Sequence, residues 1–252
     1  MITRDELLHY LNRLLKPELF HDYAPNGLQV EGKEKIERII TGVTANQALF
    51  DEAVKQEADL VFVHHGFFWQ DEDPRVIGIK KNRLQTLLNH NINLIGYHLP
   101  LDAHPIYGNN AQLAKLFDFV VEDRMPSMTS SSLVWKGKLS KAVDGKMFCQ
   151  QLKNKLHREP LYIPGRSEKI SSIAWCSGGA GSYIGEIVDC NFDAYLTGEV
   201  TESIVHVARE YGMHLFVAGH HATERYGVKA LGEHIAEKFN VQCQFVDVDS
   251  PV

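Results

Sequence analysis

The sequence predicts an α/β protein made of two related lobes with mainly parallel sheets. Apolar runs of strand length alternate with helical patterns, as they do in βαβ units. The second half of the chain repeats the spacing of the first half. Histidines and carboxylates follow apolar runs in both halves, and ligands of open α/β sheets bind beyond the carboxyl ends of strands.

The first residues predict a helix that runs to about Leu15 and is opened by a capping box of Thr3 and Glu6. They do not resemble a signal peptide, because acids stand where a signal would be basic and no continuous apolar segment follows. No apolar run approaches about 18 residues, so we expect no membrane span. A cytoplasmic protein without a membrane partner is predicted.

The first half of the chain predicts a turn-rich segment followed by three strands and two helices. The turn-rich segment is Asp22–Val30, in which Pro25 and Asn26-Gly27 suit a tight turn. The expected strands are Arg38–Val43, Leu60–Val63 and Asn93–Tyr97, and the expected helices are Asn46–Gln56 and Arg83–His90.

The second half predicts four strands and three helices, with a turn of small residues, Ser177–Gly181, after its first strand. The expected strands are Ser172–Cys176, Asp193–Thr197, His214–Ala218 and Gln242–Val248, and the expected helices are Tyr183–Asp189, Glu202–Tyr211 and Gly227–Phe239. Residues 122–141 lack a clear period, so we expect the boundary between lobes 1–124 and 125–252 there. Leu161–Arg166 is predicted to be irregular.

Two offsets place the second half on the first with one alignment gap. An offset of 134 residues matches Asp59 with Asp193 and His65 with Glu199. An offset of 122 residues matches His98 with His220 and Asp102 with Glu224. The pattern predicts that both lobes send strand ends towards a common cleft.

The charge balance limits the partners. Twenty-six basic and 32 acidic residues give a net charge of −6, which argues against a general binder of phosphate backbones. Direct nucleic-acid binding is therefore not expected, whereas nucleotides stay possible because a metal can supply local positive charge. The absence of any CxxC pair argues against a zinc–thiolate site and favours free thiols at Cys149, Cys176, Cys190 and Cys243.

His64 and His65 follow a buried strand and are candidate metal ligands. Extended backbone would point them in opposite directions, so they could serve two metals, or one could support the other. The alternative is that they are turn residues satisfied by backbone hydrogen bonds. The apolar run Val61–Val63 favours a functional reason, because buried polar groups must be paired.

His98 and Asp102 flank Pro100, which disfavours a helix, so their spacing is predicted to be a loop spacing. Asp102 is the better candidate ligand. His98 either binds a metal, hydrogen-bonds a ligand or a metal-bound water, or is a satisfied core histidine.

His220 and Glu224 would share one face of a helix that began at His220, which is the spacing for two ligands of one centre. His221 would then point away, and the two oxygens of Glu224 could bridge two metals. The alternative is a helical turn with solvated side chains.

Glu199 is either a general acid or base, a partner of a ligand, or a charge that favours the N-terminus of the following helix. Ser177–Gly181 is similar to a phosphate-cradling turn but lacks GxGxxG and a Walker lysine, so close backbone packing is its alternative.

Together these motifs give a resemblance that covers essentially the whole chain. The sequence resembles the GTP cyclohydrolase I type 2 family, also called the Ngg-interacting-factor-three-like family. The segments that carry the resemblance are Asp22–Val30, Val63–Gly66, His98–Asp102, Leu196–Glu199 and Gly219–Glu224.

The resemblance implies two interlinked lobes, a ring-shaped homohexamer and a site for two divalent metal ions. His64 and His220 would bind one metal, His65 and Asp102 the other, and Glu224 would bridge them. A donor set of imidazoles and carboxylates accepts Fe, Zn, Mn, Ni or Mg.

The family name implies opening of the purine ring of GTP, and the resemblance also implies a link to radiation resistance and DNA repair. Our main hypothesis is a di-metal hydrolase that acts on a nucleotide or damaged nucleotide. The metals would lower the pKa of water towards ~7, and the hydroxide would attack a carbon such as C8 of guanine. His98 or Glu199 would move the proton. The alternatives are a two-metal phosphoesterase and a non-enzymatic, metal-binding ring scaffold.

Overall fold

A computed structural model describes residues 1–125 and 133–252. Their contacts form two compact units, each built from two segments: unit 1 is Met1–Gly108 with Gly227–Asp249, and unit 2 is Asn109–Tyr226 with Ser250–Val252. The expected boundary at 122–141 lies partly outside the described residues, at 126–132. The lobes 1–124 and 125–252 differ from these units and stay a prediction about domains.

Unit 1, all of whose residues are described, contains a five-stranded sheet in the order β13-β4-β5-β6-β2. Its first four strands are parallel, and β2 is antiparallel to β6. The strands are β2 (Gly27–Val30), β4 (Arg38–Thr44), β5 (Leu60–His65), β6 (Asn93–Gly96) and β13 (Gln242–Phe245), and β1 (Ile2–Thr3) pairs separately with β3 (Lys35–Ile36). The helices that pack in this unit are α1 (Arg4–Leu15), η1 (Pro17–Leu19), α2 (Gln47–Lys55), α3 (Gly78–Asn89), α4 (Leu99–Ala103) and most of α9 (His220–Phe239).

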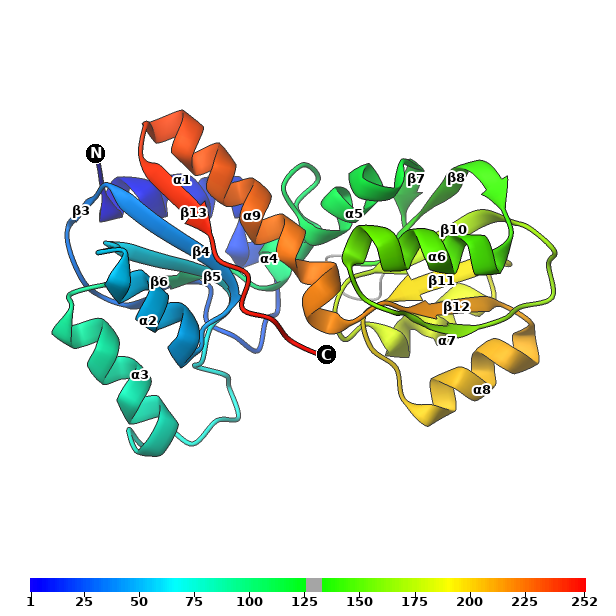
Figure 1. Cartoon of the computed structure of the whole chain (residues 1–252), viewed down its shortest axis with the longest axis horizontal. Coiled ribbons are helices and arrows are strands. Elements are labelled where there is room, and N and C mark those ends of the chain that lie inside the picture. Colours follow the sequence, from blue (N-terminus) through cyan, green and yellow to red (C-terminus); the bar gives the residue numbers. More distant parts are fainter. Residues whose placement is uncertain (126–132) are drawn as a thin grey trace. The chain divides into compact units, whose positions relative to one another are not determined.

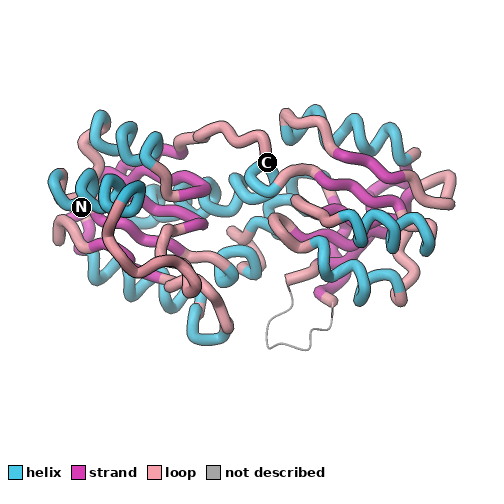
Figure 2. Tube along the Cα trace, turned by 90° about the horizontal axis from the view of Figure 1, so that it is seen from below, coloured by secondary structure: helices cyan, strands magenta, loops and turns pink. Residues whose placement is uncertain are grey.

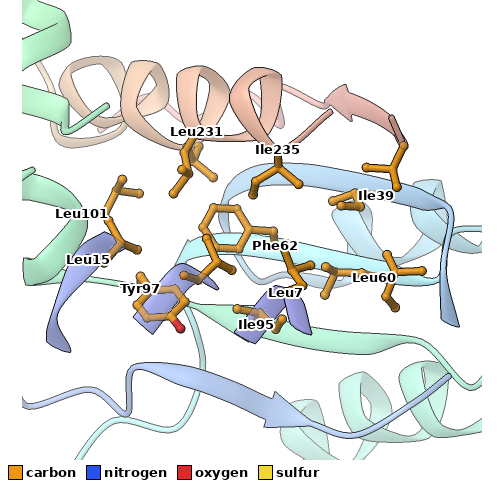
Figure 3. Close-up of a cluster of buried hydrophobic side chains, with 14 of the residues drawn as sticks. Leu7, Leu15, Ile39, Leu60, Phe62, Ile95, Tyr97, Leu101, Leu231 and Ile235 are labelled. Atoms are coloured by element: carbon orange, nitrogen blue, oxygen red, sulfur yellow. The ribbon is translucent and has the colours of Figure 1, made fainter. Parts of the chain in front are cut away.

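Alternate residues of each central strand in unit 1 pack against different helices. Phe62 and Ile95 belong to a core cluster with α1 and α9, whereas their neighbours Val61 and Leu94 pack with α2 and α3. Figure 3 shows Phe62 between Leu231 of α9 and the residues of α1. The sheet is therefore covered on both faces, as a parallel sheet requires.

Over the described part of unit 2, one sheet has the strand order β7-β8-β10-β11-β12-β9. The centre, β10-β11-β12, is parallel, and the outer strands are antiparallel. The strands are β7 (Phe119–Arg124), β8 (Trp135–Val143), β9 (Leu161–Ile163), β10 (Ile170–Cys176), β11 (Ala194–Thr197) and β12 (His214–Val217). The helices are α5 (Asn109–Phe117), α6 (Gly145–Leu156), η2 (Gly181–Tyr183), α7 (Ile184–Val188) and α8 (Glu202–Tyr211).

Two core clusters cover the faces of the unit 2 sheet. Trp175 and Phe216 pack with α5 and α6, whereas Tyr195 and Leu215 pack with α7 and α8. Figure 2 shows the strands of each unit flanked by helices. The predicted α/β class is confirmed, with parallel strands at the centre of each sheet. No helix in residues 1–125 or 133–252 is long and apolar enough to cross a membrane.

Several sequence expectations need correction. Leu161–Arg166 contains a strand, β9, and the region 122–141 overlaps β7 and β8. These antiparallel strands lie at or next to the sheet edges, and most residues of β7 are exposed, so they lack the apolar run of a buried strand. The capping box of Thr3 and Glu6 is confirmed.

The loop predicted around Pro100 is a short helix, α4, with Pro100 in its first turn. A proline is tolerated there because the amide that it lacks would have no partner within the helix. The helix predicted to begin at Gly227 begins instead at His220, so His220 and Glu224 are in one continuous helix.

The strand registers agree with the repeat that the sequence predicts. Ile39 pairs with Leu60 in unit 1, and the residues 134 positions later, Ile173 and Ala194, pair in unit 2. The third strands, β6 and β12, are offset by 121 residues. Asn93 of β6 pairs with Leu60, and His214 of β12 pairs with Ala194. The 122-residue offset between the two histidine motifs therefore includes one extra residue in the second copy.

Candidate metal centre

Candidate ligands gather in two clusters, both at carboxyl ends of parallel strands. We define the histidine cluster of unit 1 as His64, His65, His98 and Asp102, and the His–Glu cluster of unit 2 as Glu199, His220 and Glu224. Every member of the histidine cluster is buried, and the Glu224 side chain is only 3% exposed. Polar groups buried in this way need hydrogen bonds, protons or cations as partners.

His64 and His65 are the last two residues of β5, and they lie in the strand and not in a turn. Their ring centroids are 4.4 Å apart, so the rings converge at the end of the strand. This corrects the expectation that the two side chains point in opposite directions. His98 lies beside both, with its ring centroid 5.2 Å from that of His64 and 5.5 Å from that of His65.

The hydrogen bonds of His64 fix which nitrogen offers a lone pair. Its Nδ1 lies 3.0 Å from the carbonyl oxygen of Tyr97, which can only accept, so Nδ1 carries the proton. A neutral ring then offers a lone pair at Nε2, which lies 3.4 Å from Oδ1 of Asp102. Two electron-pair donors at this distance repel unless a proton or a cation lies with them. This donor pair fits a divalent metal.

His65 and His98 also use Nδ1 within unit 1 and so direct Nε2 elsewhere. Nδ1 of His65 is 3.2 Å from Oγ1 of Thr44, and Nδ1 of His98 is 2.8 Å from Oδ1 of Asp22. One nitrogen from each of His64, His65 and His98 lies within 4.8 Å of the others. The histidine cluster therefore converges as a metal site requires.

Asp22 and Asn26 position His98, a role that our sequence interpretation missed. Oδ1 of Asn26 accepts from the backbone amide of His98 at 2.8 Å, and Asp22 accepts from the amide of Leu99 at 3.0 Å. Burial opposes ionisation of Asp22, but the hydrogen bonds and charge of His98, with the other donors, outweigh it and lower the pKa of Asp22. The available signal was an acid and an amide four residues apart in a turn-rich segment.

The first turn of α9 places His220 and Glu224 on one face, as the helical interpretation predicts. Nε2 of His220 is 3.0 Å from Oε2 of Glu224, and its Nδ1 is 2.9 Å from Oε1 of Glu199. Burial alone would lower the pKa of His220, but the two carboxylates outweigh it and raise this pKa to about 9. Two carboxylates that flank one imidazole in this way also suit a metal cation.

The turn Ser177–Gly181 packs closely against the His–Glu cluster. Gly178 has φ +65°, and a Cβ there would lie 2.0 Å from Oε1 of Glu224. The amide of Gly178 donates to Oγ1 of Thr223 at 3.0 Å, and the amide of Ser177 donates to Oδ1 of Asn110 at 2.9 Å. These two amides are engaged within the protein, which favours the packing interpretation over a phosphate cradle.

A family model described as Duf34/NIF3 (NGG1p interacting factor 3) matches residues 2–251. The chain belongs to the Duf34/NIF3 family. Two curated relatives of this Duf34/NIF3 chain are each called GTP cyclohydrolase 1 type 2 homolog. The one from Pseudomonas aeruginosa is 47% identical over 250 residues, which are 99% of each chain. The one from Escherichia coli K12 is 47% identical over 247 residues, which are 98% of each chain.

Solved structures of Duf34/NIF3 relatives have the same fold. Protein ybgI, described as of unknown function, matches with a TM-score of 0.96 and 47% identity over all of both chains. TTHA1606 from Thermus thermophilus matches with a TM-score of 0.88 and 33% identity, also over all of both chains. These likenesses extend over both units of the Duf34/NIF3 chain.

Proposed function

We propose that the chain is a di-metal hydrolase that acts on a nucleotide or a related nitrogen heterocycle. The observation that supports this most is the 3.4 Å approach of His64 Nε2 to Asp102 Oδ1, with the proton of His64 held on Nδ1 by the Tyr97 carbonyl. This arrangement is unfavourable for two lone-pair donors by themselves and favourable around a cation. The same chemistry recurs in the His–Glu cluster, where His220 faces a buried carboxylate.

The proposed ligands come from both clusters: His64, His65, Asp102, His220 and Glu224. The pattern of the family resemblance supports the set, since all five positions carry the expected residue. Divalent cations bound there would supply Lewis acidity and would make hydroxide available from water near neutral pH. Sulfur is absent from the set, so Fe, Zn, Mn, Ni and Mg are the candidates.

His98 is the proposed group that holds and moves a proton. Asp22 accepts a hydrogen bond from its Nδ1, which orients the ring and leaves Nε2 as the nitrogen that can take up or release a proton. Glu199 is the second candidate, because its side chain is 45% exposed and can exchange a proton with solvent while it contacts His220. Its hydrogen bond to His220 Nδ1 also suits the orientation of a ligand.

The substrate class rests on the relatives, which are called GTP cyclohydrolase 1 type 2 homologs. For this chain we propose hydrolysis of a C–N bond in a purine-like ring, in the cytoplasm, by a homo-oligomer such as a ring-shaped hexamer. A link to DNA repair is part of the proposal. The phosphoesterase alternative has less support, because the amides of Ser177 and Gly178 donate within the protein.

The test combines metal analysis with a substrate screen. Gently purified protein should contain about two divalent metal ions per chain, and the His64→Ala and Asp102→Asn variants should contain fewer. The metal-loaded protein is then incubated with nucleotides and damaged nucleosides, and products are followed by mass spectrometry. Metal-dependent addition of water to a heterocycle is the expected result. Metal-bound protein that converts no compound, together with ligand variants that keep full cellular function, would favour the scaffold alternative.

A further inference from the structure

Two aromatic side chains stack beside the histidine cluster and have no role in the proposed chemistry. The rings of Tyr23 and Trp69 have centroids 5.6 Å apart and planes inclined by 30°. The backbone ties their segments together, because the amide of Gln70 donates to the carbonyl oxygen of Tyr23 at 2.9 Å. We call this pair the aromatic shelf.

Both rings of the aromatic shelf meet the ring of His98 nearly at right angles. The Tyr23 ring lies 5.0 Å from the His98 ring at 74°, and the Trp69 ring lies 5.4 Å from it at 88°. Trp69 also lies 5.9 Å from the ring of His65. A planar molecule that is parallel to the shelf would therefore have its plane nearly perpendicular to the imidazole that we propose to move a proton.

The aromatic shelf is open to solvent at one member and supported at the other. Tyr23 is 55% exposed, whereas Trp69 is only partly exposed and contacts both His65 and His98. Tyr23 is next to Asp22, which binds the His98 ring and the amide of Leu99, and Asn26 of the same turn binds the amide of His98. The turn that positions the proton-transfer group thus also positions the exposed ring.

We propose that the aromatic shelf binds the planar, π-bonded ring of the substrate by stacking and so determines its class. This inference rests on the proposed function and narrows it. Stacking recognises any planar base and is indifferent to a sugar or phosphate. The chain should therefore bind a nucleoside or a free base and should discriminate against a sugar phosphate without a base.

The fluorescence of Trp69 provides a test that does not depend on turnover. The other tryptophans, Trp135 and Trp175, are buried, so Trp69 is the one that a stacked base can quench. Metal-loaded full-length protein is titrated with guanosine, with guanine, and with ribose 5-phosphate. We expect saturable quenching by the first two probes and none by the third, and loss of the quenching signal in Trp69→Phe.

Binding by the variants is measured by calorimetry, which does not need the fluorophore. Trp69→Leu and Tyr23→Leu should each weaken guanosine binding about tenfold, because a base stacked on an aromatic ring contributes about 1–3 kcal/mol and tenfold corresponds to about 1.4 kcal/mol. Tyr211→Leu is the matched control, since Tyr211 of α8 is also 55% exposed, and it should bind guanosine like the parent protein. Circular dichroism and metal content confirm that each variant is folded and loaded.

The outcomes separate this inference from the proposed function. Guanosine binding that is unchanged in both leucine variants, absent altogether, or matched by ribose 5-phosphate would overturn the aromatic shelf. Quenching that depends on Trp69, in a protein that hydrolyses no heterocycle, would support the shelf and contradict the hydrolase. Turnover of a non-aromatic substrate would support metal-dependent hydrolysis and overturn the shelf.

Discussion

The carboxylate of Asp59 caps the start of β4 in the same way as the carboxylate of Asp193 caps the start of β10. Each carboxylate accepts hydrogen bonds from two successive backbone amides, at 2.9 and 3.0 Å for Asp59 and at 2.9 Å twice for Asp193. The two aspartates are 134 residues apart, which is the offset of the strand registers. The repeat therefore preserves a hydrogen-bonding device as well as a strand pattern.

Replacement of Asp59 by asparagine should destabilise the protein in a pH-dependent way. Burial raises the pKa of Asp59, but hydrogen bonds from Lys33 and two amides outweigh it and lower the pKa below the ordinary 3.8. A carboxyl group whose pKa is lower in the folded protein stabilises the fold at pH values above its pKa in the unfolded chain. This stabilisation is lost as the pH falls through the pKa of the folded protein. We expect Asp59→Asn to cost about 1–2 kcal/mol at pH 7 in urea unfolding and less as the pH drops below about 4.

Asp73 provides the control for that measurement. Its pKa is also lowered, by Arg75, but the side chain is exposed and the ion pair is solvated. Asp73→Asn should unfold at the same urea concentration as the parent protein at both pH values. Equal effects of the two substitutions would show that the cap formed by Asp59 is not the source of the stability.

An alanine at Gly178 should disturb the His–Glu cluster. The residue has φ +65°, where a side chain is strained, and its Cβ would lie 2.0 Å from Oε1 of Glu224. We expect Gly178→Ala to lose about 1–3 kcal/mol of stability and to bind metal more weakly. Gly185→Ala is the matched control, because no atom lies within 4 Å of its new Cβ and the residue is in α7. It should be neutral or should stabilise by up to ~1 kcal/mol.

Asp22→Asn should impair turnover much more than metal binding. The new asparagine side chain would lack the negative charge that faces Nδ1 of His98. Asn26 would still bind the backbone amide of His98. We expect a roughly 10–100-fold fall in kcat with nearly normal metal content, as for other partners of site histidines. ¹⁵N NMR of the imidazoles should show a changed tautomer for His98. An unchanged His98 signal with full turnover would remove Asp22 from the mechanism.

Glu199→Gln should weaken metal binding by about 10–100-fold without changing the fold, because Glu199 orients His220 through Nδ1. A chelator competition measures the affinity, and thermal unfolding of the metal-free protein checks the fold. Glu202→Gln is the control, since Glu202 is 91% exposed and its nearest ionic partner is His206 at 3.9 Å. Metal affinity that is equal in the two variants would contradict the role of Glu199.

Strong local patterns made the central strands and the candidate ligands predictable from the sequence. Buried parallel strands contain continuous apolar runs such as Leu60–Val63, and the histidines that follow this run are easily recognised in the sequence. The capping box at Thr3 needs only residues three apart, so it too could be recognised.

The remaining features depend on tertiary contacts that leave little local signal. The exposed residues of β7 show no alternation of apolar and polar side chains, and the strand lies at the edge of the sheet, where its backbone pairs with β8. The pairing of Asp22 with His98 joins residues 76 positions apart, which no spacing rule connects. The convergence of His64 and His65 depends on the local geometry at the end of β5, which an ideal extended strand does not describe.

The extra residue in the second copy has an evolutionary consequence. His98 precedes α4 as its N-cap, whereas His220 is the first residue of α9, after Gly219 at φ +97°. If both halves descend from one duplicated gene, insertion of a single codon would have carried the second histidine from the cap into the helix. Divergence by one codon would have let one ancestral motif acquire two different tasks, without any change in the strands that carry it.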